Sequence, residues 1–215
     1  MSGVPAGARV VLATRNAHKL EEMRAILADA LEAAGEGLDL ATAVVSLEGL
    51  DAPHVVESGV TFAENALLKA RAAAVATGLP AVADDSGLAV DVMGGAPGVF
   101  SARWSGRHGD DGANVDLLLR QLADVPAAHR GAEFVCALAL VTRDGREVVE
   151  HGVLRGTLAP SPRGSGGFGY DPVLQLVDDE RTLAELSSSE KNAISHRSQA
   201  LRALAPSVLR LLRQR

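Results

Sequence analysis

Two adjacent aspartates, Asp84 and Asp85, are the residues of this sequence best suited to chemistry. They follow an apolar run at 80–83 and precede Ser86 and Gly87. Two carboxylates beside a buried strand cost free energy unless they bind a cation or accept hydrogen bonds. Because neighbouring strand residues point to opposite faces, we expect one carboxylate to be structural and the other catalytic. A Mg²⁺ ion held by one or two carboxylates and by phosphate oxygens would fit this pattern, and an Asx-turn at a strand end is the alternative.

A cationic segment lies between an expected strand and an expected helix. Its residues are Thr14, Arg15, Asn16, Ala17, His18 and Lys19. Free backbone N–H groups and the helix dipole attract anions at such a position, and Lys19 adds a point charge. The segment therefore indicates a phosphate site, and an ordinary helix cap with solvated charges is the alternative.

Two further polar clusters occur in the last third of the sequence. In the glycine-rich segment Gly164–Asp171, the backbone could approach a flat ligand and the ring of Phe168 could stack on a base. Lys191, His196 and Arg197 then supply donors that could read carbonyl oxygens or bind phosphate. A flexible surface loop and the basic face of a surface helix are the respective alternatives.

The elements that must position these clusters alternate between strands and helices. Periodicity, capping signals and breaks predict strands at 9–13, 38–45, 80–83, 132–141 and 146–154, and helices at 16–35, 61–76, 113–122 and 187–215. Thr61 to Glu64 has the form of a capping box, Asp144-Gly145 predicts a hairpin turn, and we expect a bend or break near Pro206. The alternation predicts an α/β fold in which a mixed sheet carries helices on both faces.

The composition excludes several classes of function. With 215 residues, 47% of them hydrophobic, the chain can bury a large core, and a single two-lobed domain over residues 1–215 is expected. A net charge of −6 argues against nucleic-acid binding, which needs a basic face. The single cysteine, Cys136, and the lack of a signal or membrane-spanning segment predict a soluble protein of the reducing cytoplasm.

Five segments of the chain, in this order, resemble those of the inosine/xanthosine triphosphate pyrophosphatases, also called the Ham1-like family. The resemblance covers about residues 10–204. It rests on the segments TRNAHK, ESGVTFAENALLKA, PAVADDSGLAVDVMGGAPGVFSARW, GGFGYDPV and EKNAISHR.

This resemblance implies a homodimeric, Mg²⁺-dependent enzyme that splits dITP, ITP and XTP into the monophosphate and pyrophosphate. It also implies an elongated mixed sheet flanked by helices, and two lobes with a central cleft for the substrate. By similarity, Thr14–Lys19 would hold the triphosphate, Lys19 would also take part in catalysis, Asp85 would be the metal-associated proton acceptor, and Ser86 would touch the substrate. The base would be held by Phe168, Gly169, Tyr170 and Asp171 and by Lys191, His196 and Arg197.

The chemistry of these residues agrees with the implied roles. A carboxylate beside Mg²⁺ has a low pKa and is a weak base, so we expect Asp85 mainly to orient the attacking water. Hypoxanthine and xanthine carry a carbonyl at carbon 6, where adenine carries an amino group. A donor from His196 or Arg197 would pair with that carbonyl but face another donor in adenine, at a cost of about 1–3 kcal/mol for each unpaired donor. No element of the sequence accounts for the exclusion of guanine.

Three positions depart from the family pattern. Arg15 stands where many relatives have a small residue, and it could lengthen the grip on phosphate or point to solvent. Val56 stands where many relatives have an acidic residue, so Glu57 is the expected second metal ligand and Glu64 its alternative. Ser198 replaces a frequent glycine, a change that we expect to be mild.

Two other functions compete with this reading. A related enzyme could remove pyrophosphate from modified or pyrimidine nucleotides, and the base segments GGFGYD and AISHR argue for purines instead. A catalytically silent nucleotide-binding protein is the other candidate, and the intact Asp84, Asp85 and Lys19 argue against it.

Overall fold

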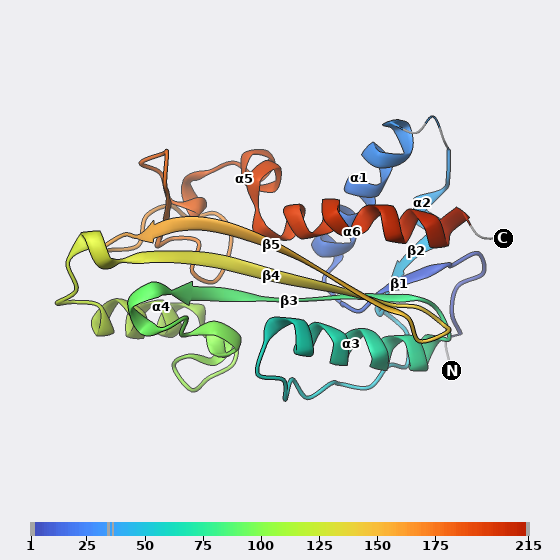
Figure 1. Cartoon of the computed structure of the whole chain (residues 1–215), viewed down its shortest axis with the longest axis horizontal. Coiled ribbons are helices and arrows are strands. Elements are labelled where there is room, and N and C mark those ends of the chain that lie inside the picture. The colour runs from blue at the N-terminus through green and yellow to red at the C-terminus, as the bar shows by residue number, and fades with distance from the viewer. Residues whose placement is uncertain (1–2, 34, 36, 214–215) are drawn as a thin grey trace. The chain divides into compact units, whose positions relative to one another are not determined.

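The computed structural model describes residues 3–33, 35 and 37–213, and it shows a six-stranded sheet with the order β2-β1-β3-β4-β5-β6 (Figure 1). The strands are β1 (Val10–Leu12), β2 (Val44–Ser46), β3 (Ala81–Val90), β4 (Gly131–Val141), β5 (Glu147–Leu158) and β6 (Leu174–Leu176). The α-helices are α1 (Ala17–Ala33), α2 (Leu40–Ala43), α3 (Phe62–Thr77), α4 (Asp111–Gln121), α5 (Ser188–Ile194) and α6 (His196–Arg213). β1 pairs in parallel with β2 and β3, whereas β6 is antiparallel to β5. The expected α/β class with a mixed sheet is therefore confirmed.

The chain divides into two compact units, each of which is described by itself. The first comprises Met1–Asp85, Ala137–His151 and Arg197–Arg215, and the second comprises Ser86–Cys136 and Gly152–His196. Residues 1, 2, 34, 36, 214 and 215, including both ends of the expected 1–215 domain, lie outside the described residues. Among the helices described, none is long and apolar enough to cross a membrane.

In the first unit α3 lies along the sheet (Figure 1), and the contact between them is made by small side chains. α3 begins with the expected capping box, in which the Thr61 hydroxyl accepts from the N–H of Glu64 and the Glu64 carboxylate accepts from the N–H of Thr61. It ends at Gly78, whose φ of 67° is left-handed. The contact with β3 and β4 is made largely by alanines: Ala66, Ala70, Ala83, Ala137 and Ala139. Because alanine lets backbones approach closely, polar side chains on α3 can reach β3.

The second unit has a larger apolar core between α4 and the sheet, formed by residues that include Leu88, Val90, Leu118, Leu122 and Phe134. Tyr170 is buried in this core, and its hydroxyl donates to the carbonyl of Ser101 at 2.9 Å. Burial raises the pKa of this phenol. The Gly164–Asp171 segment is thereby anchored to the core through Tyr170.

Three expectations about individual elements are wrong. Within the strand expected at 38–45, Leu40–Ala43 instead form the short helix α2, and only Val44 and Val45 belong to β2. The Asp39 carboxylate caps α2 by accepting from the N–H groups of Ala41 and Thr42. β3 does not end before the two aspartates, since it continues to Val90. The helical break at the C-terminus falls at Ser195, which is extended, and α6 continues through Pro206.

Candidate functional site

Asp84 lies in the middle of β3, in the first unit, and only 7% of its surface is exposed. Its two carboxylate oxygens accept from Lys19 Nζ at 2.8 and 2.7 Å, and Arg197 Nε donates to one of them at 3.3 Å. Burial alone would raise the pKa of this carboxyl, but the charges of Lys19 and Arg197 outweigh burial and hold the pKa well below its usual value. Asp84 is therefore a charged anchor that fixes two cationic side chains.

Asp85, the next residue, has a different set of partners. Lys69 Nζ donates to its Oδ1 at 3.0 Å, and Asn65 Nδ2 donates to its Oδ2 at 3.2 Å. The same Lys69 ammonium donates to Glu57 Oε1 at 2.7 Å. Burial raises the pKa of Asp85 because Lys69 offsets only part of the lost hydration. For Lys69, burial acts to lower the pKa, but the attraction of Asp85 and Glu57 prevails and raises it.

Two residues of this group, Asn65 and Lys69, were not among the expected site residues. They are four positions apart on α3, so they lie on one face of the helix and reach the same carboxylate. A polar pair at this spacing in an alanine-rich helix was the signal for them. Glu64 does not join the group, because its carboxylate accepts from the N–H groups of Val60 and Thr61 in the capping box. Glu57 is the acidic residue that the structure brings near Asp85.

The cationic segment forms a turn that leads into α1. The Thr14 hydroxyl accepts from the N–H of Asn16 at 3.1 Å, and Ala17 begins the helix. Lys19 is therefore in the first turn of α1, from which it reaches Asp84. The side chain of His18 lies outside the described residues.

Arg15 is directed toward a neighbouring segment of the first unit. Its Nη2 donates to the carbonyl of Ala52 at 3.0 Å. Ala52 belongs to the irregular stretch at 51–60 that carries Glu57. Arg15 therefore ties this stretch to the cationic segment, a role that the sequence did not indicate.

Phe168 and Asp171 meet in a tight turn of the second unit. Asp171 is 2% exposed, and its carboxylate accepts from the N–H of Phe168 at 2.8 Å and forms an ion pair with Lys191. Lys191 Nζ lies 4.8 Å from the centre of the Phe168 ring, a cation–π distance. The ring remains 60% exposed, which leaves a surface on which a flat base could stack.

The glycines of this turn serve the turn itself. A Cβ on Gly167 would lie 2.0 Å from the carboxylate of Asp171, and its φ is 72°. The N–H of Gly169 donates to the carboxylate of Asp111 at 2.8 Å.

Ser86, the first residue of this unit, continues β3 directly after Asp85 and is half-buried.

Lys191, His196 and Arg197 do not lie on one continuous helix, because the extended Ser195 separates Lys191 on α5 from His196 and Arg197 on α6. Lys191, on α5, pairs with Asp171 in the second unit. His196 is also in the second unit, where it is 6% exposed and stacks on Phe134 with 4.9 Å between ring centres. Arg197 belongs to the first unit and pairs with Asp84.

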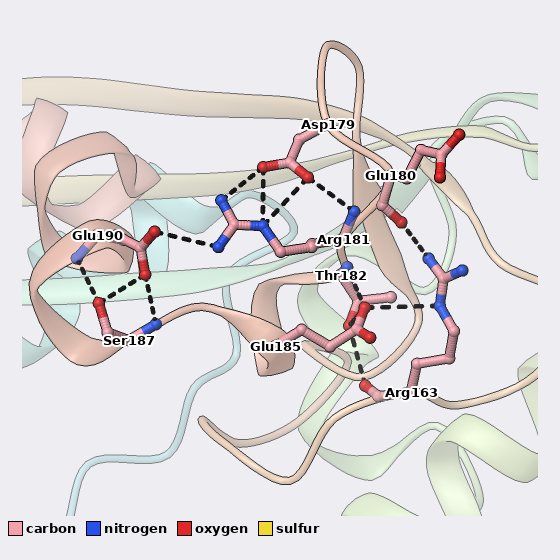
Figure 2. A network of polar contacts seen from close by, with 8 residues as sticks. All are labelled: Arg163, Asp179, Glu180, Arg181, Thr182, Glu185, Ser187 and Glu190. Atoms are coloured by element: carbon pink, nitrogen blue, oxygen red, sulfur yellow. Dashed lines mark hydrogen bonds and ion pairs between the residues drawn. The ribbon is translucent and has the colours of Figure 1, made fainter.

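A polar network in the second unit fixes the chain that leads to α5 (Figure 2). Arg181 forms ion pairs with Asp179 at 2.7 Å and with Glu190 at 3.0 Å. Glu190 accepts from the N–H and hydroxyl of Ser187 in the capping box that starts α5, and these bonds, with Arg181, lower the pKa of Glu190 to about 2. The network thus sets the position of Lys191, which follows Glu190.

The carboxylates of Glu57 and Asp85 fit a small, hard cation. They already converge on one cation, the ammonium of Lys69, at 2.7 and 3.0 Å. Within the described part of the chain, no group of three or more His, Cys, Asp or Glu side chains is arranged to hold a metal ion. A Mg²⁺ ion at this pair would therefore need further oxygens from phosphate or water, as this ion commonly does.

Known proteins of one family are similar to this chain over nearly its whole length. A protein of Streptomyces avermitilis named dITP/XTP pyrophosphatase is 65% identical over 208 residues, which cover 95% of this chain and 98% of that protein. The structure of a HAM1 protein from Coxiella burnetii matches with a TM-score of 0.83 and 40% identity, covering 94% of this chain and 99% of that chain. A nucleoside-triphosphatase, dITP/XTP pyrophosphatase, from Mycobacterium abscessus matches with a TM-score of 0.75 and 50% identity, covering 93% and 99%. The model of the Ham1 family matches residues 10–207, and this chain belongs to that family.

Proposed function

We propose that this protein is a Mg²⁺-dependent pyrophosphatase that hydrolyses dITP, ITP and XTP to the monophosphate and pyrophosphate. Membership of the Ham1 family and relatives named dITP/XTP pyrophosphatase support the reaction. The observation that carries the proposal is the division of labour between Asp84 and Asp85. One carboxylate fixes the cations Lys19 and Arg197, and the other is paired with a second carboxylate around a cation position.

Glu57 and Asp85 would hold the metal ion in this reaction. When bound, Mg²⁺ would supply charge neutralisation on the polyphosphate and increase the acidity of water. Asp85 would orient the attacking water toward the α-phosphorus and accept its proton, and Asn65 fixes one of its oxygens for that purpose. Lys69 keeps the pair of carboxylates together from α3.

The segment Thr14–Lys19 would bind the triphosphate. The backbone N–H groups at the start of α1 and the helix dipole favour an anion there. Asp84 would hold the Lys19 ammonium in place, so that little entropy is lost when phosphate binds. Ser86 would contact the substrate beside Asp85.

The base would be held by the Phe168–Asp171 turn and by donors from Lys191, His196 and Arg197. The exposed face of Phe168 supports stacking, and the rigid contacts of Asp171 support a preformed turn. Donors that point at the substituent on carbon 6 would form hydrogen bonds with the carbonyl of hypoxanthine and xanthine. Adenine carries an amino group there, so its binding would be weaker by about 1–3 kcal/mol for each donor left unpaired.

The wider setting is part of the same proposal. The protein would act as a homodimer in the cytoplasm, without nucleic-acid or membrane partners, and would remove deaminated purine nucleotides before polymerases use them. The test is a panel of dITP, ITP, XTP, ATP, GTP and dUTP with Mg²⁺, with released pyrophosphate as the readout. We expect rates on dITP and XTP at least tens of times those on ATP, and equal rates on ITP and ATP would refute the selectivity.

A further inference from the structure

Lysine is rare in this chain, and each lysine is paired with a largely buried aspartate. Among 21 basic residues, only Lys19, Lys69 and Lys191 are lysines, and the others are arginines. Each lysine forms an ion pair with an aspartate that is largely buried: Asp84, Asp85 and Asp171 respectively. Arginine offers a rigid fork, whereas lysine carries a compact charge on a flexible stem that can move without the backbone. Lysine is therefore better suited than arginine to a position where the positive charge has to move away from the carboxylate that it pairs with.

Lys69 differs from the other two lysines because it bridges two carboxylates. Its ammonium lies 2.7 Å from Glu57 Oε1 and 3.0 Å from Asp85 Oδ1. The exposed fractions of the three side chains are 20% for Lys69, 28% for Glu57 and 13% for Asp85. Two carboxylates held close together at this degree of burial repel each other unless a cation lies between them.

We infer that Lys69 is an internal counter-ion that occupies the cation position between Glu57 and Asp85 and is displaced from it when Mg²⁺ binds. This inference rests on the proposed assignment of Glu57 and Asp85 as the metal pair. An ammonium and a divalent cation that share the same two carboxylate oxygens would lie close enough to repel each other. Lys69 is thus a positioning residue: it holds the carboxylates ready before the metal ion arrives, and its removal makes the metal ion bind more tightly.

Lysine ammonium NMR on the unmodified protein, labelled with nitrogen-15 at lysine, tests the displacement directly. The spectrum contains at most three side-chain signals, which Lys69→Arg and Lys191→Arg assign. In a titration with MgCl₂ and no nucleotide, we expect the Lys69 signal to shift and its protons to exchange faster with water, while the Lys191 signal stays in place. A Lys69 signal that does not respond to Mg²⁺ overturns the inference.

Metal affinity provides the second readout. Binding of Mn²⁺ without nucleotide, followed by electron paramagnetic resonance, is compared between the wild type, Lys69→Met and Lys19→Met. We expect Lys69→Met to lower the Kd by about tenfold or more, and Lys19→Met, which removes the same charge beside Asp84, to change it by less than about threefold. An unchanged Kd for Lys69→Met, or an equal gain in both variants, overturns the inference. If the Lys69→Met variant does not fold, the NMR titration of the unmodified protein with MgCl₂ decides whether Lys69 is displaced. Neither readout requires turnover, so failure of the proposed activity is seen separately, as a lack of dITP cleavage.

Discussion

Replacing Asp84 by Asn should destabilise the protein far more than replacing Asp85 by Asn. Asp84 is 7% exposed and pairs with both Lys19 and Arg197, so the variant removes the aspartate that pairs with Lys19 and one of the two carboxylates that pair with Arg197, the other being Glu22. Breaking a buried ion pair by removing one partner costs about 3–5 kcal/mol. Because 27% of the Lys19 side chain is exposed and can regain water, we expect the lower end, about 3 kcal/mol. For a chain of this length that loss corresponds to a fall of about 6–12 °C in Tm.

Asp85→Asn is the matched control for this measurement. Burial raises the pKa of Asp85, which means that burying its charge costs free energy that an asparagine does not cost, and Lys69 keeps Glu57 as a partner when the charge is removed. We expect a loss of less than about 1 kcal/mol in the free energy of unfolding, together with loss of turnover. Urea unfolding and calorimetry of both variants at pH 7 measure the difference. Equal losses in the two variants, or no loss in Asp84→Asn, would refute the division into an anchoring and a catalytic carboxylate.

Two further predictions concern the second unit. Tyr170 is the only tyrosine, and burial raises its pKa, so above about pH 10 the unfolded chain loses a proton that the folded chain retains. The free energy of unfolding should therefore fall as the pH rises from 9 to 11, and less so in Tyr170→Phe; equal slopes in the two proteins would contradict this. Arg130 is buried and donates to the carbonyls of Leu122 and Val125 at 2.8 and 2.9 Å after the end of α4. Arg130→Met should lose about 3 kcal/mol in urea unfolding, since hydrogen bonds to a charged group contribute about 1.5–3 kcal/mol each; a loss below about 1 kcal/mol would show that water replaces them.

Much of the fold was predictable from local signals. The capping box at Thr61 and the glycine at 78 define α3 because both act through the backbone within one turn. The alternation of side chains along a strand predicted one structural and one catalytic aspartate; Asp84 and Asp85 do have different partners, and the catalytic role of Asp85 stays a prediction. The strand expected at 38–45 was right only at its end, where Val44 and Val45 belong to β2, because Asp39 caps a helical turn over Leu40–Ala43.

The parts of the candidate site that escaped prediction depend on contacts between distant segments. The spacing of Asn65 and Lys69 is a signal within α3, but their partner Asp85 is distant in the sequence, and the close packing of alanines brings Lys69 to it. Arg197 was expected to act with Lys191 on one helix, but the extended Ser195 separates them, and Arg197 pairs with Asp84. The spacing of residues along a helix does not reveal this break, because it occurs at a serine and no glycine or proline marks it.

The products formed from dITP test the central claim most directly. Purified protein, dITP and Mg²⁺ are followed by phosphorus-31 NMR, which distinguishes pyrophosphate from orthophosphate. We predict dIMP and pyrophosphate in equal amounts from the first turnover, with no dIDP, and no product from Asp85→Asn. Orthophosphate and dIDP as the first products would contradict the proposed reaction.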